Sequence, residues 1–176
     1  MTKMEEKKAR FLMEMRTYQE MRRCELEGIV EFLVKALRRE EIILIWCTSE
    51  RVGITLLRKM IDKMNAVGVK RGMIIADLGI TTGAQTLARK KRIESIPKDF
   101  PSFNIFKHEL VPLHEILTEE EKKEILKKYH IKVYDMPRIS RSDPAIVAIG
   151  GRSGDVIRII RNSPTAGKHI FYRYVG

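Results

Sequence analysis

The acidic residues beside two short apolar runs are the first candidates for chemistry in this chain of 176 residues. A nuclease of the restriction-endonuclease type carries an acid on one strand and an acid-x-lysine pair on the next, so that a metal and the lysine activate water. Ile42–Trp46 and Gly72–Ala76 are the candidate strands here, and neither contains an acid. Asp77 follows the second run, but no lysine stands two residues beyond it. The pattern does not favour a metal nuclease, which stays open as an alternative.

Two histidines, each followed by a glutamate, raise the question of a metal site. His108 and His114 are six residues apart, whereas metal ligands on one helix are usually spaced by three or four. Pro112 between them breaks any shared helix. Cys24 and Cys47 lack Cys-x-x-Cys spacing, which argues against a zinc site or a disulfide framework and is typical of a reducing compartment. We therefore expect no metal and no cofactor.

Two glycine-rich segments differ in how well they suit phosphate binding. Gly150–Gly154 lacks the lysine of a P-loop and leads into an alternating strand pattern, so we interpret it as a turn. Gly79–Ala84 leads into a helix whose first amides can face a phosphate, and four basic residues follow at 89–92. This second segment is a candidate contact with a nucleic-acid backbone. Because no serine or cysteine sits in a nucleophile-elbow context, we expect no enzyme activity.

The net charge of +11 is concentrated in two blocks of the chain. Residues 51–100 hold eleven basic and four acidic residues, and residues 151–176 hold five and one. A basic block on a folded domain attracts polyanions, usually nucleic acid, although a solubilising face or a patch for an acidic protein partner are alternatives. No run of 18 apolar residues and no secretory signal is present, so we expect an intracellular soluble protein without a membrane span.

The apolar pattern of the first hundred residues predicts a small α/β layer. Residues 4–39 have apolar side chains at roughly helical spacing, with Gly28 dividing the helix. Strands at 42–46 and 72–76 then alternate with helices at 52–64 and 84–92, and Gly68 ends the first of these helices. This alternation favours parallel strands. A segment at 96–102 with two prolines marks the expected domain boundary.

The remaining residues form a single dense module. Thr118 and Glu121 form a capping box, which predicts a helix to Tyr129 that buries Ile125, Leu126 and Tyr129. The module closes with strands at 156–161 and 169–175, joined by a turn at 162–168. Its prolines and compact turn are typical of a pre-ordered surface that docks onto a larger partner.

From His108 onwards the chain resembles a known family. It is similar to the fifth-largest subunit shared by eukaryotic nuclear RNA polymerases, whose C-terminal half corresponds to a small subunit of archaeal RNA polymerase. The matching segments are His108-Glu109-Leu110-Val111-Pro112, Thr118–Lys123, Met136–Ile139, Ser142–Ala145, the Gly150 and Gly154 turn, Val156–Arg161, Ser163–Gly167 and Tyr172-Arg173.

The first half resembles the eukaryote-type N-terminal jaw domain of that family more loosely. The resemblance implies an α+β protein with two domains. Residues 1–102 would form a shortened α/β jaw with a restriction-endonuclease-like fold and no metal site, and residues 103–176 a mixed α+β assembly domain. Thr82 stands where the family's loop carries a proline, which puts a specific DNA contact by that residue in doubt.

The family resemblance implies a non-catalytic subunit of nuclear DNA-directed RNA polymerase that acts in transcription. It would dock on the largest subunit, alongside the other subunits, and support downstream duplex DNA weakly and without sequence preference. The implied polymerase-docking residues are His108, Glu109, Pro112, His114, Pro137, Arg138, Asp143, Pro144, Pro164, Thr165 and Gly167. The implied DNA-proximal residues are Thr81, Thr82, Arg89, Lys90, Lys91 and Arg92. A stand-alone basic nucleic-acid-binding module and a cytoplasmic viral polymerase subunit stay open.

Overall fold

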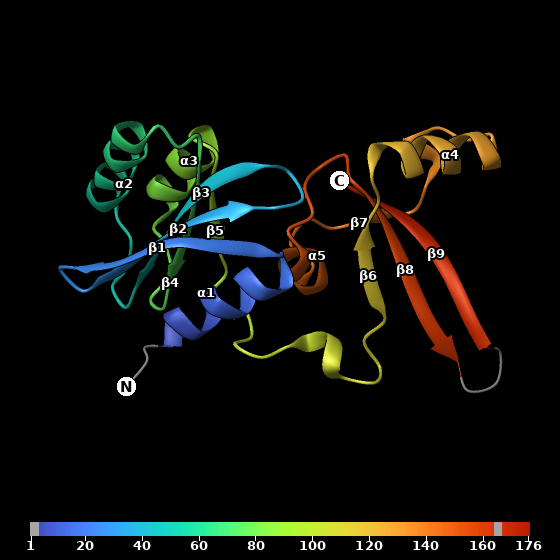
Figure 1. Cartoon of the computed structure of the whole chain (residues 1–176), viewed down its shortest axis with the longest axis horizontal. Coiled ribbons are helices and arrows are strands. Elements are labelled where there is room, and N and C mark those ends of the chain that lie inside the picture. Colours follow the sequence, from blue (N-terminus) through green and yellow to red (C-terminus); the bar gives the residue numbers. More distant parts are fainter. Residues whose placement is uncertain (1–3, 164–166) are drawn as a thin grey trace. The chain divides into compact units, whose positions relative to one another are not determined.

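The computed structural model describes residues 4–163 and 167–176, and it divides into two compact units. Unit 1 comprises residues 1–103 and unit 2 comprises residues 104–176. Each unit has a sheet of its own (Figure 1). Each also has its own cluster of buried hydrophobic side chains. Within the two described ranges, no helix is both long and apolar enough to cross a membrane.

Unit 1 is built on a five-stranded sheet with the strand order β1-β2-β3-β4-β5. Strands β1 to β3 pair antiparallel, whereas β3, β4 and β5 pair parallel. Helices α2 and α3 make the connections between the parallel neighbours, which a short turn cannot bridge. In chain order the elements are α1 (Met4–Met15), β1 (Tyr18–Leu26), β2 (Ile29–Ala36), β3 (Glu41–Thr48), α2 (Ile54–Val67), β4 (Arg71–Ala76), α3 (Thr82–Lys90) and β5 (Ile93–Ile96).

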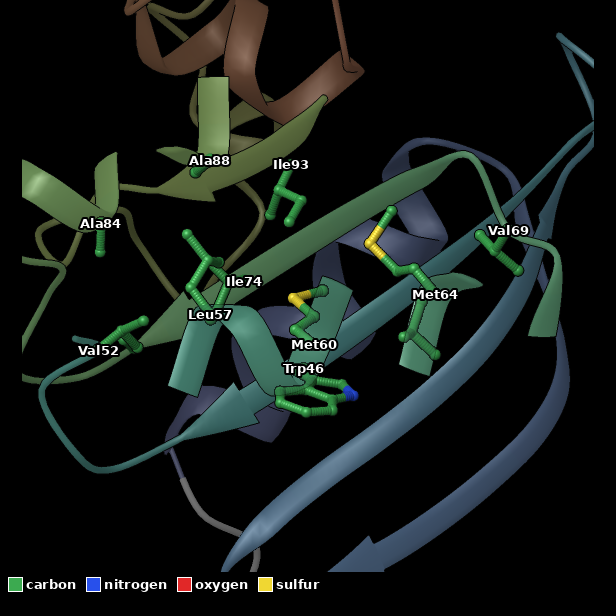
Figure 2. Close-up of a cluster of buried hydrophobic side chains, with 12 residues drawn as sticks. Trp46, Val52, Leu57, Met60, Met64, Val69, Ile74, Ala84, Ala88 and Ile93 are labelled. Atoms are coloured by element: carbon green, nitrogen blue, oxygen red, sulfur yellow. The ribbon is translucent and has the colours of Figure 1, made fainter. Parts of the chain in front are cut away.

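Different helices cover the two faces of this sheet (Figure 1). Helix α1 packs on β1, β3 and β4, and α2 and α3 lie on the opposite face. On that second face Trp46, Leu57 and Ile74 belong to one buried cluster (Figure 2). The indole N–H of Trp46 donates to Oε2 of Glu31 at 2.8 Å. Burial on both faces explains why the central strands are uninterrupted apolar runs in the sequence, and the strands expected at 42–46 and 72–76 are confirmed.

The helix expected over residues 4–39 is wrong beyond Met15, because a β-hairpin follows α1. Glu27 and Gly28 form its turn with φ values of 49° and 78°, as a type I′ turn requires at both central positions. Buried residues alternate with less buried ones along β2, which is the period of a strand and not of a helix. The partner strand β1 is the sheet edge, mostly exposed, and its register shifts between Glu20 and Arg22.

Two glycines shape the junction between α2 and β4. Gly68 adopts φ 73° and donates to Asn65 O, while the N–H of Val69 donates to Met64 O at 2.8 Å, so the helix ends in a Schellman motif. This confirms that Gly68 terminates the helix. At Gly72 a Cβ atom would lie 2.9 Å from both Met60 Cε and Met64 Sδ, so β4 approaches α2 closely there.

Unit 2 is built on a four-stranded sheet with the strand order β6-β8-β9-β7. Strand β8 pairs antiparallel with β6 and β9, and β7 pairs parallel with β9. In chain order the elements are η1 (Ile105–Lys107), β6 (Leu113–Ile116), α4 (Glu119–Tyr129), η2 (Val133–Asp135), β7 (Arg138–Ile139), α5 (Pro144–Ile149), β8 (Val156–Ser163) and β9 (Gly167–Val175).

Part of each face of this second sheet is covered. Ile146 and Ile149 of α5 pack with Ile157 on one face, and α4 packs with Val156 and Leu117 on the other. The capping box that starts α4 is confirmed, since Glu121 N–H donates to the Thr118 hydroxyl and the Thr118 N–H to the Glu121 carboxylate.

The expected burial of Tyr129 needs correction, and two short elements were not predicted. The side chain of Tyr129 is 51% exposed and not buried, because it lies at the last turn of α4, where its ring packs against that of Tyr172 with centroids 6.2 Å apart. Helix α5 and strand β5 were not expected at all. Both are too short to show a clear period in the sequence, at six and four residues.

Candidate functional site

Three aliphatic side chains form a row across the outer part of the unit 2 sheet. Leu113 of β6 is paired with Ile160 of β8, and Ile160 is paired with Ile170 of β9. Directly paired residues point to the same face of a sheet. Leu113 and Ile170 are each about half exposed, at 49% and 48%, so this row is a contiguous apolar surface. We refer to Leu113, Ile160 and Ile170 as the apolar row.

The apolar row lies on the same sheet face as α4 but beyond the part that α4 covers. Arg158, two residues from Ile160, marks the border. Its guanidinium donates to Glu115 at 2.9 Å and lies 3.4 Å from Glu121. The hydrogen bond to Glu115 and the two carboxylate charges raise the pKa of Arg158 against the opposing effect of burial. This ionic cluster ties α4 to the sheet and leaves the apolar row uncovered within unit 2.

The segment before β6 is held by local contacts. Nδ1 of His114 donates to the carbonyl of Pro112 at 2.8 Å, and Nδ1 of His108 accepts from the Leu110 amide at 3.2 Å. The ring of His114 also packs against Phe106, with centroids 5.8 Å apart. Leu110 is left 83% exposed by this arrangement. Glu109 is exposed as well, so this segment offers a pre-ordered surface beside the apolar row.

The other expected docking residues lie in places that serve the fold. Pro137 and Arg138 are exposed at the start of the short edge strand β7, where Arg138 pairs with Tyr174. Asp143 caps α5 through a hydrogen bond from Ala145 N–H at 2.8 Å, and Pro144 occupies the first helical turn.

The connection between β8 and β9 is only partly described. Pro164 and Thr165 lie outside the described residues. Gly167 opens β9 with φ 73°, a value that favours glycine. The strand pair itself confirms the two strands expected at 156–161 and 169–175.

Reasoning from the sequence missed the apolar row and Phe171, which is half exposed and stacks on His169 at 6.3 Å. The available signal was the clustering of Ile, Phe and Tyr in β9. That signal becomes informative only when the register with β6 and β8 is known, because register decides which side chains share a face.

The expected DNA-proximal residues divide between the two ends of α3. Thr81 is the N-cap and accepts a hydrogen bond from Ala84 N–H at 3.4 Å, and Thr82 begins the helix. The preceding loop is held by reciprocal backbone bonds of 3.0 Å between Val52 and residues 79 and 81. The basic residues at 89–92 occupy the last turn and the residues after it. At 1.5 Å per residue the two groups are about 13 Å apart, so no single phosphate or other small ligand can contact both.

The described residues contain no cluster of three or more His, Cys, Asp or Glu side chains that could hold a metal ion. Asp77, the acid that a nuclease would use, is exposed at the end of β4. Burial raises the pKa of the Cys47 thiol, with help from the charges of Glu6 and Glu5, so this thiol stays protonated and unreactive.

Comparison with known proteins identifies the family. Residues 103–175 match the profile of the RNA polymerase Rpb5 C-terminal domain. The DNA-directed RNA polymerase subunit Rpo5 of Thermococcus onnurineus is 59% identical over 73 residues, which are 42% of this chain and 89% of the relative. The corresponding subunit of Thermococcus kodakarensis is 60% identical over the same coverage. This chain belongs to the Rpb5 family of RNA polymerase subunits.

The family resemblance extends beyond unit 2. The subunit RPABC1 of DNA-directed RNA polymerases I, II and III from Caenorhabditis elegans is 34% identical over 140 residues, which cover 77% of this chain and 66% of the relative. Because unit 2 has only 73 residues, this alignment includes much of unit 1. The Rpb5-family chain is therefore a non-catalytic subunit of a transcription enzyme and not an enzyme by itself, as the sequence predicted.

A comparison of folds adds a weaker likeness. An alignment with a structure of EndoMS in its apo form has a TM-score of 0.42 and 19% sequence identity, and it covers 54% of this chain and 46% of the EndoMS chain. At that score no common fold or activity follows. The two sheets establish a mixed α+β architecture for this Rpb5-family chain, and an endonuclease-like jaw in unit 1 stays a prediction.

Proposed function

We propose that this chain docks on the largest subunit of an RNA polymerase through unit 2, contacts the neighbouring subunits there, and supports downstream duplex DNA through unit 1. The observation that carries the docking role is the apolar row, an exposed aliphatic surface on a sheet whose inner part is buried on both faces. Contiguous exposed apolar surface is typical of protein-binding sites. His108, Glu109 and Pro112 would lie at the margin of this interface. The ring of His114, next to Leu113 in β6, points to the opposite face of the sheet, where a further subunit contact would lie.

The energetic gain from docking can be worked out from exposure. Fully burying an aliphatic side chain contributes about 1.5–3 kcal/mol, so burying the exposed half of Leu113 or Ile170 contributes about 1 kcal/mol each. An aspartate at position 170 removes this contribution and places a carboxylate without a partner in the interface, which costs more than the lost burial. A substitution of Ile170 should therefore give a large loss of docking affinity.

The DNA role rests on charge and on the start of α3. The Thr81 cap and the loop before it present backbone amides at a helix N-terminus, where phosphate is favoured. The basic residues at 89–92 add attraction without sequence preference, which salt weakens. A nine-residue helix is short enough for both of its ends to face one duplex. Such a subunit acts where DNA is transcribed, which in a eukaryotic cell is the nucleus.

A tagged full-length chain, recovered from its native cells, tests the docking role. We expect the wild-type chain to co-purify with the two large catalytic polymerase subunits, and Ile170→Asp to recover about a tenth as much of them. Leu26→Asp is the matched control, because it places the same charge at an exposed aliphatic residue of unit 1. Equal recovery with Ile170→Asp would contradict the docking surface. Recovery of nucleic acid alone by the wild-type chain would favour a stand-alone binding module.

The DNA role needs a separate measurement on the assembled polymerase. Arg89→Glu is expected to shorten the lifetime of complexes on downstream duplex DNA, and the effect should shrink as salt is raised. Lys128→Glu, which changes the charge of α4 in unit 2 by the same amount, serves as the control. A lifetime that does not depend on Arg89 at low salt would refute the role of this basic end.

A further inference from the structure

Unit 1 has an open hollow of about 490 Å³ where the C-terminal end of α2 meets the C-terminal end of α3. Its floor is apolar and consists of Ile61, Met64 and Val69. Met64 and Val69 also belong to the buried cluster and lie at one edge of it in Figure 2. The hollow therefore reaches the edge of the hydrophobic core, where Met64 and Val69 are 5% and 6% exposed.

The rim of the hollow is strongly basic. Lys70, Lys90, Lys91 and Arg92 line it, and none of the lining residues is acidic. All four side chains are exposed, and none of them forms an ion pair with another described residue. Neighbouring cations of this unit differ, since Arg71 pairs with Glu41 at 3.0 Å and Lys63 lies 3.9 Å from Glu31. Four cations without an acidic neighbour around an apolar floor form a surface that attracts a polyanion.

The chemistry of the floor decides which polyanion fits. A single-stranded nucleic acid held in a groove stacks its bases on aromatic side chains, and the lining of this hollow contains none. A duplex would contact the basic rim alone and leave the apolar floor unfilled. A phosphate placed over Ile61, Met64 and Val69 would lose water without gaining a donor from the floor. A peptide with one large apolar side chain between acidic residues matches both parts, since the apolar side chain fills the floor and the carboxylates reach the rim. The flexible thioether of Met64 can adapt to such a side chain.

We propose that this hollow, the α2–α3 pocket, binds an acidic segment of a partner protein through one large apolar anchor. The pocket lies at the end of α3 opposite Thr81 and Thr82, so it is separate from the loop assigned to DNA. It does share Lys90, Lys91 and Arg92 with the proposed DNA-binding residues. If the DNA role holds, an acidic segment bound here also displaces the duplex from this end of α3.

Binding of a synthetic peptide to the free full-length chain tests the proposal. The probe is a fluorescent peptide of about twelve residues with one central phenylalanine among aspartates and glutamates, followed by anisotropy at about 0.15 M salt. We expect saturable binding that weakens about tenfold when the phenylalanine is replaced by alanine. Trp46 fluorescence, from the only tryptophan of the chain, verifies that unit 1 stays folded in every variant.

Two matched charge reversals separate the pocket from general attraction. Lys90→Glu with Lys91→Glu is expected to weaken peptide binding about tenfold or more. Arg22→Glu with Arg51→Glu makes the same change in net charge at exposed residues outside the pocket, on the edge strand β1 and after β3, and should weaken binding less than about twofold, because distant charges are screened. Ile61→Ala should weaken the phenylalanine peptide but not the alanine peptide, which a double-mutant cycle reports as coupling.

Three results would overturn the proposal. The first is an equal loss of affinity with both charge reversals, which would show attraction by net charge alone. The second is a peptide affinity that does not depend on phenylalanine or on Ile61. The third is that a duplex DNA of equal charge binds in a way that depends on Lys90 and Lys91, while the peptide does not bind. That result would make the hollow part of a nucleic-acid surface. Because the assay uses the free chain, its outcome is independent of polymerase recovery.

Discussion

The ion pair between Arg16 and Glu94 allows a quantitative test of what holds unit 1 together. Arg16 follows α1, its side chain is 2% exposed, and its two terminal nitrogens donate to the Glu94 carboxylate of β5 at 2.8 and 2.7 Å. Burial by itself lowers the pKa of Arg16, but the charge and hydrogen bonds of Glu94 outweigh this and raise it, so the guanidinium stays charged. Glu94 is 37% exposed. The two partners therefore differ greatly in their access to water.

This difference predicts that the two single substitutions have unequal costs. Glu94→Gln removes the negative charge that faces the buried guanidinium at 2.7 Å. Removing one partner of a fully buried pair costs about 3–5 kcal/mol, and solvent access on the Glu94 side reduces this to about 2–3 kcal/mol. Arg16→Met leaves a carboxylate that water can reach, and the methionine refills the buried volume, so we expect about 1 kcal/mol. The double variant should resemble Arg16→Met alone.

Urea unfolding followed by Trp46 fluorescence measures these free energies. Trp46 is the only tryptophan and lies buried in β3, so its emission reports unit 1 without a contribution from unit 2. The slopes of the free energy against urea should be equal across the four proteins, which makes the midpoints comparable. If Arg16→Met costs as much as Glu94→Gln, or if the two costs add in the double variant, the argument from unequal solvent access fails.

Three further predictions concern single positions. Burial by itself raises the pKa of Glu6, but the hydrogen bonds and charges of Arg23 and Arg10 outweigh it and bring the pKa below its ordinary 4.5. The ionised Glu6 should therefore stabilise unit 1 above about pH 4.5, and this contribution should be lost as the pH falls through the lowered pKa. Urea titrations at several pH values should show a smaller loss of stability with acid for Glu6→Gln than for the wild-type chain. Gly72→Ala should cost about 1 kcal/mol, because two flexible methionine ends must move and Ile93, 3.2 Å from the new Cβ, must shift slightly. Gly72→Val should cost about 3 kcal/mol, and similar melting temperatures for both variants would contradict the close packing. Thr118→Ala should destabilise α4 by about 1 kcal/mol in circular-dichroism melts, and an unchanged melt would mean that the cap contributes nothing.

Local signals were enough to predict several elements from the sequence. The capping box at Thr118 and the helix end at Gly68 each depend on residues within one turn, and both are observed. The apolar runs of β3 and β4 were recognisable because both faces of a central strand are buried. The hairpin after Met15 was not predicted, because the apolar residues of β2 fit two patterns. Ile29, Leu33 and Leu37 happen to lie at helical spacing, and this hid the alternation of Val30 with Phe32.

The candidate sites depended on contacts between distant segments and could not be predicted locally. The apolar row joins Leu113 with Ile160 and Ile170, which are more than forty residues further along the chain. Asp143 is a docking residue by the family resemblance, and its additional role as the cap of α5 could not be predicted because that helix is too short to leave a periodic pattern. The basic residues near Arg89 follow Thr82 closely in sequence, yet a helix places the two groups at opposite ends.

Strand β1 protects the chain during the time that it spends without partners. An edge strand with free backbone groups is a template for pairing with another copy of the same sheet. In β1 the charged side chains of Arg22 and Arg23 and the register shift after Glu20 interrupt that template. Arg23 is also tied to Glu6 of α1, which holds the strand against its own domain. We therefore expect this edge to disfavour strand pairing between free copies of the subunit before a polymerase assembles.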